Sequence, residues 1–215
     1  MKFRALAVSS VAVGLSACGG LLETTIPAPQ AYVLRLPERA APAAASRAGS
    51  LLLQRPEAGP GLDSDRIVLL RSDSRFDTYA ASRWAAAAPD MLEALMVDGL
   101  RSGGAFSAVF DDSSPYAPRY DMRCTLRRFD ADYTSGSGAP TVVVALDCTL
   151  GRHRDRALLA GFTAQGSAVA RADRLNDVVA AFNAATLTAI TELERQAAAA
   201  VANEAAPANE GAPAQ

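Results

Sequence analysis

Two runs near the middle of the chain alternate between apolar and polar positions, the pattern of a strand with one buried face. Residues 119–129 read RYDMRCTLRRF and residues 141–150 read TVVVALDCTL. The turn-rich segment TSGSGAP separates the two runs, so we expect them to form an antiparallel hairpin. If the hairpin is symmetric about Gly136, residues equidistant from it face each other, which pairs Leu126 with Leu146 and Cys124 with Cys148.

This register sets the two cysteines side by side on the apolar face of the hairpin. In an oxidising compartment they are expected to form a disulfide, which stabilises the fold by about 3–4 kcal/mol in the chain-entropy model. The alternative is that Cys124 and Cys148 are buried free thiols acting as small apolar residues. No metal site is expected at either cysteine, because histidine or acidic residues do not stand at ligand spacing with them.

Further apolar runs predict the rest of the fold. Further strands are expected at residues 32–36, 66–71, 76–83, 106–110 and 157–169. A helix begins near Pro89 and carries an apolar stripe that includes Leu92, Met96 and Leu100. A second, long helix follows Asp173 as its cap, with a stripe that extends to Leu193. The predicted fold class is α+β: a single domain with a mixed, largely antiparallel β-sheet and two main helices packed on it.

The amino-terminal segment has the three parts of a secretory signal. Lys2 and Arg4 precede an apolar run, which small residues follow. The run is shorter than the ~20 apolar residues that span a bilayer. Its end, Leu15-Ser16-Ala17-Cys18, resembles the lipobox of bacterial lipoproteins, in which the cysteine receives a diacylglyceryl group and becomes the acylated amino terminus. Cys18 is therefore the expected lipidation site, and the alternative is an ordinary signal peptide with a chance cysteine.

The residues after Cys18 bear on which membrane holds the anchor. In enteric-type sorting, an aspartate directly after the lipidated cysteine retains a lipoprotein in the inner membrane, whereas glycines occupy positions 19 and 20 here. That resemblance favours the periplasmic face of the outer membrane over the inner membrane. The expected domain organisation is a signal peptide at 1–17, a tether at 18–30, the α+β domain at 31–195 and an Ala/Pro-rich disordered tail at 196–215.

The charge of the chain does not indicate nucleic-acid binding, and its candidate nucleophiles do not indicate catalysis. The chain has 21 basic and 23 acidic residues, without the basic excess that nucleic-acid binding requires. The single histidine, His153, lies between two arginines that oppose its use as a base, and nothing nearby resembles a nucleophile elbow. Asp111 and Asp112 are interpreted as turn residues. We therefore expect no catalytic residues, no metal and no cofactor, and the chain is not predicted to be an enzyme.

A family resemblance covers most of residues 30–195. The opening YVLRLP, the strand RIVLLR and the stretch RFDTYAASRWAAAAPDMLEALMVDGLRSGGAFSAVF are similar to the auxiliary lipoproteins of ABC-type transport systems that carry MCE proteins. The resemblance implies a mixed sheet with helices packed on it and no catalytic residues. It also implies that the lipoprotein acts together with an ATPase, a permease and an MCE-domain protein. These three proteins move phospholipid or other hydrophobic molecules between the inner and outer membranes. The lipoprotein then anchors or receives the periplasmic end of the MCE assembly, possible partners being phospholipid and further copies of itself.

Two questions stay open at this point. Trp84, which matches a position of the family pattern, is interpreted either as a core residue that closes the first helix onto the sheet or as an aromatic anchor at a partner interface. The function itself has an alternative from another class, an envelope assembly or activator lipoprotein that regulates a cell-wall enzyme or an outer-membrane machine. An apolar cleft would favour direct lipid handling, and a closed core would favour docking alone.

Overall fold

The structure is a computed structural model that describes residues 28–37, 48–136 and 138–205. The expected lipidation site, Cys18, and the last ten residues lie outside the described residues.

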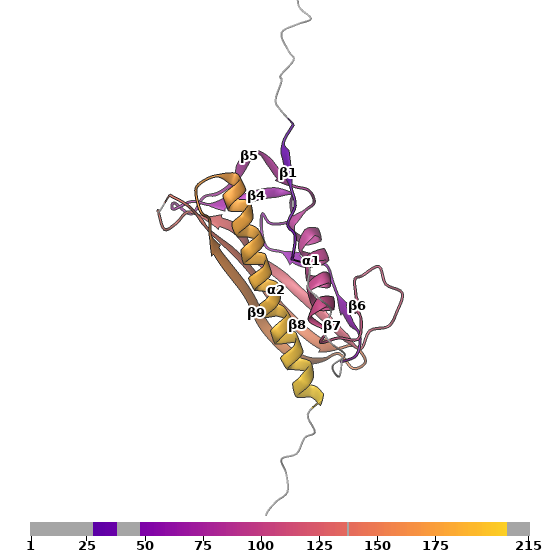
Figure 1. Cartoon of the computed structure of the whole chain (residues 1–215). Coiled ribbons are helices and arrows are strands. Elements are labelled where there is room, and N and C mark those ends of the chain that lie inside the picture. The colour runs from indigo at the N-terminus through magenta and orange to yellow at the C-terminus, as the bar shows by residue number, and fades with distance from the viewer. Residues whose placement is uncertain (1–27, 38–47, 137, 206–215) are drawn as a thin grey trace, which may run out of the picture.

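Three long antiparallel strands form one side of the sheet (Figure 1). They are β7 (Tyr120–Asp132), β8 (Thr141–Arg152) and β9 (Ala157–Val169). Cys124 lies opposite Cys148 and Leu126 opposite Leu146, so the predicted hairpin register is confirmed. A bulge after Leu126 shifts the remaining pairs by one residue, which the assumption of symmetry does not foresee.

The other edge of β7 is shared by three short strands that run parallel to it. They are β2 (Leu51–Leu53), β3 (Glu57–Ala58) and β4 (Arg66–Leu70). Beyond them, β5 (Phe76–Trp84) pairs antiparallel with β4, while β1 (Gln30–Tyr32) and β6 (Val109–Phe110) pair parallel with β5 and β2. The sheet is therefore mixed, and with its two helices it confirms the predicted α+β class.

Two helices, α1 (Ala88–Gly103) and α2 (Leu175–Ala205), cover one face of this sheet (Figure 1). Leu92, Met96 and Leu100 of α1 are at most 1% exposed, as the predicted stripe requires. The helix ends at Gly104, whose φ of 71° is the left-handed conformation that favours glycine after a helix. The apolar face of the β7–β8 hairpin lies beneath the helices, while none of the described helices covers its polar face.

Several predicted boundaries differ from the structure. The strand expected at 32–36 is limited to β1, and Leu34 is buried without strand pairing. The strand expected at 106–110 contains only two residues. Asp173 does not occupy the capping position of α2 as predicted, because the first amides of the helix donate to the carbonyl of Arg174. The Asp173 carboxylate instead accepts a hydrogen bond from Tyr133 (2.6 Å).

The boundary predicted at residue 195 falls inside α2, which continues to Ala205. Ala197 is fully buried and Val201 is 6% exposed, so this last part of the helix still packs on the sheet. Its contact surface consists mostly of alanine, which a search for large apolar residues does not detect as a stripe.

Helix α2 approaches the sheet closely at Gly166 of β9. A Cβ atom at this position would lie 2.0 Å from the carbonyl oxygen of Ala185 and 2.7 Å from the amide nitrogen of Ala189. Both atoms belong to the backbone of α2, so they cannot move aside without shifting the helix. The absence of a side chain at residue 166 therefore sets how near the helix lies to the sheet.

We expect Gly166→Ala to lower the free energy of unfolding by about 2–3 kcal/mol, because the new methyl group forces α2 away from the sheet. Gly161→Ala is the matched control, since a Cβ at this position on the same strand meets no atom within 4 Å. Urea unfolding followed by circular dichroism measures both variants. Equal stability of the two variants would contradict the close packing described here.

Candidate functional site

Trp84 lies in the core rather than at a surface. Its side chain is fully buried, with its ring centroid 5.5 Å from that of Phe129 and 5.1 Å from that of Phe182. These three rings join the end of β5 to β7 and to the first half of α2. The partner-interface interpretation of Trp84 is therefore wrong for this conformation, and the residue acts by closing the helices onto the sheet.

The structure contains a disulfide between Cys124 and Cys148, with a Cα–Cα distance of 4.1 Å. The two residues are 4% and 2% exposed, on the face of the hairpin that the helices cover. The bond closes a loop with a sequence separation of 24. It thus links β7 to β8 across the middle of the hairpin and has an architectural role.

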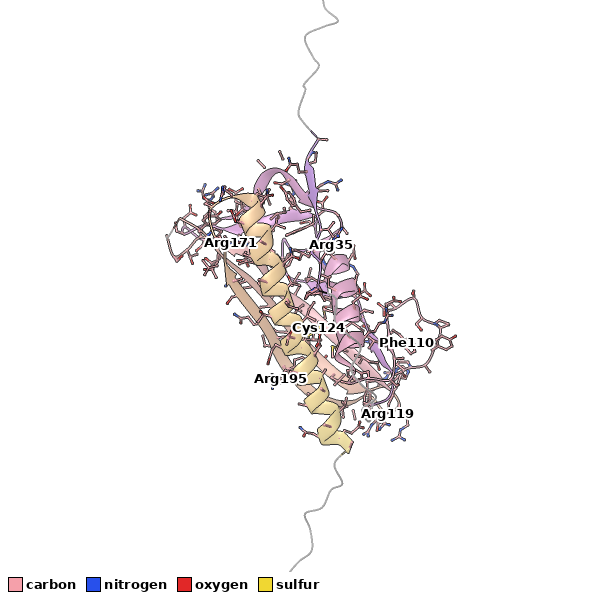
Figure 2. The ribbon with its side chains drawn as sticks, in the orientation of Figure 1. Arg35, Phe110, Arg119, Cys124, Arg171 and Arg195 are labelled. Carbon is pink, nitrogen blue, oxygen red and sulfur yellow. A yellow bond between two sulfur atoms is a disulfide. The ribbon has the colours of Figure 1, made fainter. Side chains whose placement is uncertain are left out.

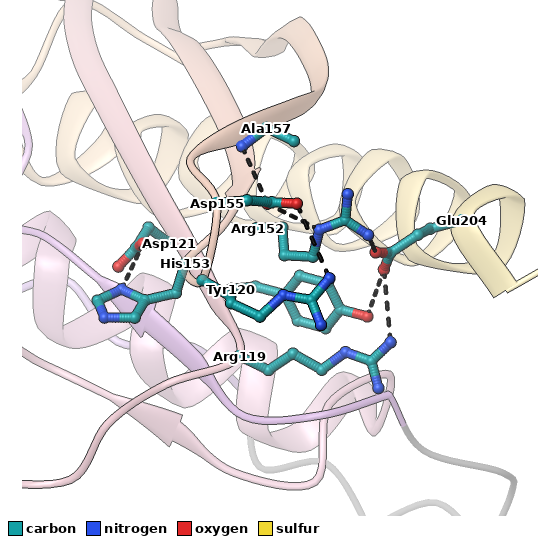
Figure 3. Close-up of polar contacts among 9 residues, drawn as sticks. Arg119, Tyr120, Asp121, Arg152, His153, Asp155, Ala157 and Glu204 are labelled. Carbon is teal, nitrogen blue, oxygen red and sulfur yellow. Dashed lines mark hydrogen bonds and ion pairs between the residues drawn. The ribbon is translucent and has the colours of Figure 1, made fainter.

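Polar side chains gather where α2 ends against the sheet, a group that we call the Glu204 cluster and define as Glu204, Tyr120, Arg152 and Arg119 (Figure 3). The carboxylate of Glu204 accepts hydrogen bonds from the Tyr120 hydroxyl (2.7 Å) and from Nη1 of Arg152 (2.8 Å). Nη2 of Arg119 lies 3.8 Å from the same carboxylate. The Glu204 side chain is only 12% exposed, so its charge is neutralised inside the cluster.

Burial raises the pKa of the Tyr120 phenol above its usual value, and the hydrogen bond and negative charge of Glu204 raise it further. The hydroxyl therefore stays protonated well into the alkaline range and keeps donating to Glu204. Stability that depends on this neutral phenol is present at neutral pH and is lost as pH rises through the raised pKa.

Sequence reasoning missed the Glu204 cluster because residue 204 falls in the segment expected to be disordered. One signal was available. Leu193, Ala197, Val201 and Glu204 follow one another at spacings of four, four and three residues, which places them on one face of a continued helix.

At the opposite end of α2, a second polar contact holds the beginning of the helix. The hydroxyls of Tyr79 and Tyr133 are 2.7 Å apart, and Tyr133 also donates to Asp173. Burial, together with these two hydrogen bonds, raises the pKa of Tyr133. Polar contacts thus attach both ends of the long helix to the sheet side of the molecule.

His153 lies in the turn between β8 and β9, exposed to solvent. Its Nδ1 atom is 2.8 Å from Oδ2 of Asp121, which extends from the polar face of β7. Across the described ranges, no group of three or more histidine, cysteine or acidic side chains is placed to hold a metal ion. The contact between His153 and Asp121 attaches the β8–β9 turn to β7.

A hollow of about 590 Å³ lies on the polar face of the sheet. Its lining includes Arg123, Thr125, Arg127, Asp147 and Thr163. Asp147 accepts hydrogen bonds from Arg127 Nε and from the Thr163 hydroxyl, each at 2.8 Å. Arg123 is exposed and has no ion-pair partner among the described residues.

A second hollow, of about 500 Å³, lies beside α1 and is mainly acidic. Its lining includes Glu93, Asp98, Asp111 and Asp112. Burial raises the pKa of Glu93, and the charges of Asp112 and Asp111 raise it further. Because charged groups line both hollows, neither has the apolar walls that an acyl chain requires.

We expect Glu204→Ala to lower the free energy of unfolding by about 1–3 kcal/mol, because it leaves the Tyr120 hydroxyl and the Arg152 guanidinium without their carboxylate. The control is Glu192→Ala, which removes an exposed ion pair with Arg195 on the same helix and is expected to cost less than about 0.5–1 kcal/mol. Chemical unfolding at pH 7 compares them. A Glu204 variant as stable as the control would show that the cluster does not hold the end of α2.

The chain is similar to proteins of known structure. None of the helices in the described residues is long and apolar enough to cross a membrane. No curated protein matches the chain significantly. The crystal structure of a Xanthomonas campestris protein, assigned to a family of unknown function, is 26% identical with a TM-score of 0.68, covering 82% of this chain and 96% of that one. An uncharacterised protein of known structure is 17% identical with a TM-score of 0.57, covering 84% and 100%, and shows the fold alone.

The family comparison gives the more specific result. The model described as "ABC-type transport auxiliary lipoprotein component" matches residues 32–198, which include every strand from β2 to β9, helix α1 and most of α2. The match spans well over half of the chain. The chain therefore belongs to the ABC-type transport auxiliary lipoprotein family.

Proposed function

We propose that this chain is the lipid-anchored accessory component of an MCE-type ABC transport system that moves phospholipid or other hydrophobic molecules between the inner and outer membranes. The observation that carries the proposal is the family match over residues 32–198. Membership makes the chain a membrane-anchored envelope protein associated with an ABC-type transport system, in a family of transport auxiliaries and not of known enzymes. The MCE partner, the outer membrane and the lipid cargo are the proposed parts.

The packing of the domain supports docking rather than carriage of lipid. The residues between the helices and the sheet form one continuous buried cluster, with Trp84, Phe182 and Leu146 fully excluded from solvent. The two hollows described above are lined by charged groups. A domain with a filled interior and a polar surface is suited to holding a partner protein, because an acyl chain needs an apolar cavity.

The proposed anchor at Cys18 would keep the domain close to the membrane. The described chain begins 28 − 18 = 10 residues after Cys18. Ten residues span at most about 33–36 Å when fully extended. Acylation at Cys18, with about 0.8 kcal/mol for each buried methylene, would hold the domain within this distance of the outer membrane, where it receives the periplasmic end of the MCE assembly.

The proposal is tested in cells by following labelled phospholipid from the inner to the outer membrane. Deleting this chain should change the phospholipid distribution as much as deleting the ATPase of the same system, and deleting both should add nothing further.

The anchor is tested by complementation. A Cys18→Ser variant should fail to restore transfer, whereas Gly20→Ala should restore it. Normal lipid distribution without the chain, in cells where loss of the ATPase alters it, would contradict the proposal. A change confined to cell-wall structure would favour the assembly alternative.

A further inference from the structure

Exposed basic side chains, most of them arginines, gather at the end of the molecule where β8 turns into β9. We call this surface the arginine end and define it as Arg119, Arg123, His153, Arg154 and Arg156. The side chains of Arg154 and Arg119 are 82% and 57% exposed. Arg123 and Arg156 are exposed and form no ion pair within the described part of the chain. Guanidinium groups therefore dominate what this end presents to solvent, although the whole chain has a net charge of −2.

The carboxylates of the same region are engaged in contacts within the molecule. Glu204 is held in its cluster, Asp121 is paired with His153, and Asp155 accepts a hydrogen bond from Nε of Arg152 at 2.9 Å (Figure 3). The nearest carboxylate to the Arg154 guanidinium belongs to Asp155, at 3.9 Å, too far for a hydrogen bond. The positive charge of Arg154 and Arg156 is thus left available to another molecule.

The turn that carries these arginines is fixed in place before any partner arrives. The amide of His153 donates to the carbonyl of Arg119 (2.9 Å), and the amide of Ala157 donates to the Asp155 carboxylate (3.3 Å). Arg152, at the start of the turn, is attached to Glu204 of α2. A surface whose backbone is already ordered loses little entropy when it binds.

Arg156 has a left-handed backbone conformation, which favours glycine over arginine. Its φ is 57°, in the left-handed region, where glycine fits without steric cost and a side chain does not. The side chain of Arg156 forms no hydrogen bond or ion pair within the described ranges that would repay this strain. An arginine at a position suited to glycine points to a use for its guanidinium group outside the domain.

The arginine end lies far from where the described chain begins. The first described residues and the start of α2 lie at one end of the molecule, and α2 runs from there to the other end, where Arg119 is located (Figures 1 and 2). With 31 residues at 1.5 Å each, the helix spans about 46 Å. A domain anchored through its amino terminus and standing on that end presents the arginines to the periplasm.

We infer that the arginine end is the docking surface for a carboxylate-rich surface of the MCE-domain protein, an inference that rests on the proposed function. Exposed guanidinium groups form paired hydrogen bonds with carboxylates and accelerate association with an acidic partner. A protein partner is favoured over anionic lipid because the arginine end lies at the opposite end of the molecule from the first described residues. A domain anchored through its amino terminus therefore holds these arginines away from its own membrane.

The direct test measures binding between the mature, lipidated chain in detergent and the purified periplasmic part of the MCE-domain protein of the proposed transport system. The double variant Arg154→Glu/Arg156→Glu should bind at least about tenfold more weakly, with most of the loss in the association rate. Raising the salt concentration should weaken the wild type more than this variant. Arg171→Glu is the matched control, because Arg171 is exposed and unpaired among the described residues but lies at the other end of the molecule (Figure 2). It should change the affinity less than about twofold.

A second variant separates docking from folding. Arg156→Gly removes one guanidinium group and also relieves the left-handed backbone, so its melting temperature should equal or exceed that of the wild type. Its affinity for the MCE-domain protein should nevertheless fall by about threefold.

Three results would overturn the inference. If the wild type binds and the arginine variants bind equally well, docking occurs elsewhere while the proposed function stands. If the wild type does not bind the MCE-domain protein, the proposed function fails as well. If the double variant loses only its binding to phosphatidylglycerol vesicles, the surface recognises a membrane.

Discussion

The position of α2 against the sheet is the constraint on which the other contacts depend. At Gly166 the helix backbone comes so near to β9 that a single methyl group would not fit. This approach buries Phe182 and Ile190 fully, and through Phe182 it fixes Trp84 in the aromatic cluster. The disulfide lies in the same buried layer and holds β7 to β8, the strand that together with β9 lies beneath α2. Packing thus determines how near α2 lies to the sheet, and polar contacts attach its two ends.

Because α2 runs from one end of the molecule to the other, its position also determines which side chains meet at each end (Figure 1). Asp173 meets Tyr133 just before the helix, and Glu204 meets Tyr120 and Arg152 in its last turn. The second contact fixes the turn between β8 and β9, so that packing in the core orders the arginine end about 46 Å away from the start of the helix. The carboxylates near this end turn inward, which leaves Arg154 and Arg156 for the proposed partner.

Much of this architecture follows from the sequence, and the exceptions have physical reasons. The alternation in residues 119–150 gives the hairpin and its facing cysteines, since a slip of one residue would turn every apolar side chain to the wrong face. The parallel strands β2 and β3 are too short for a pattern, and only their pairing with β7 defines them. The sequence favours the core role of Trp84 but leaves an interface role open, because tryptophan occurs in both places. Glu204 and the arginine end depend on the continuation of α2 beyond residue 195, where buried alanines conceal the helical stripe, and on the tertiary contacts that this continuation creates.

The central claim, that this domain docks a partner of its transport system through the arginine end, is tested most directly inside cells. A photocrosslinking amino acid placed at position 154 of the full chain, and at position 171 as a control, would be activated in growing cells and its adducts identified by mass spectrometry. The account predicts an adduct with the MCE-domain protein from position 154 and none from position 171. Adducts with that protein from position 171 alone, or adducts from position 154 only with cell-wall enzymes or outer-membrane machines, would contradict it.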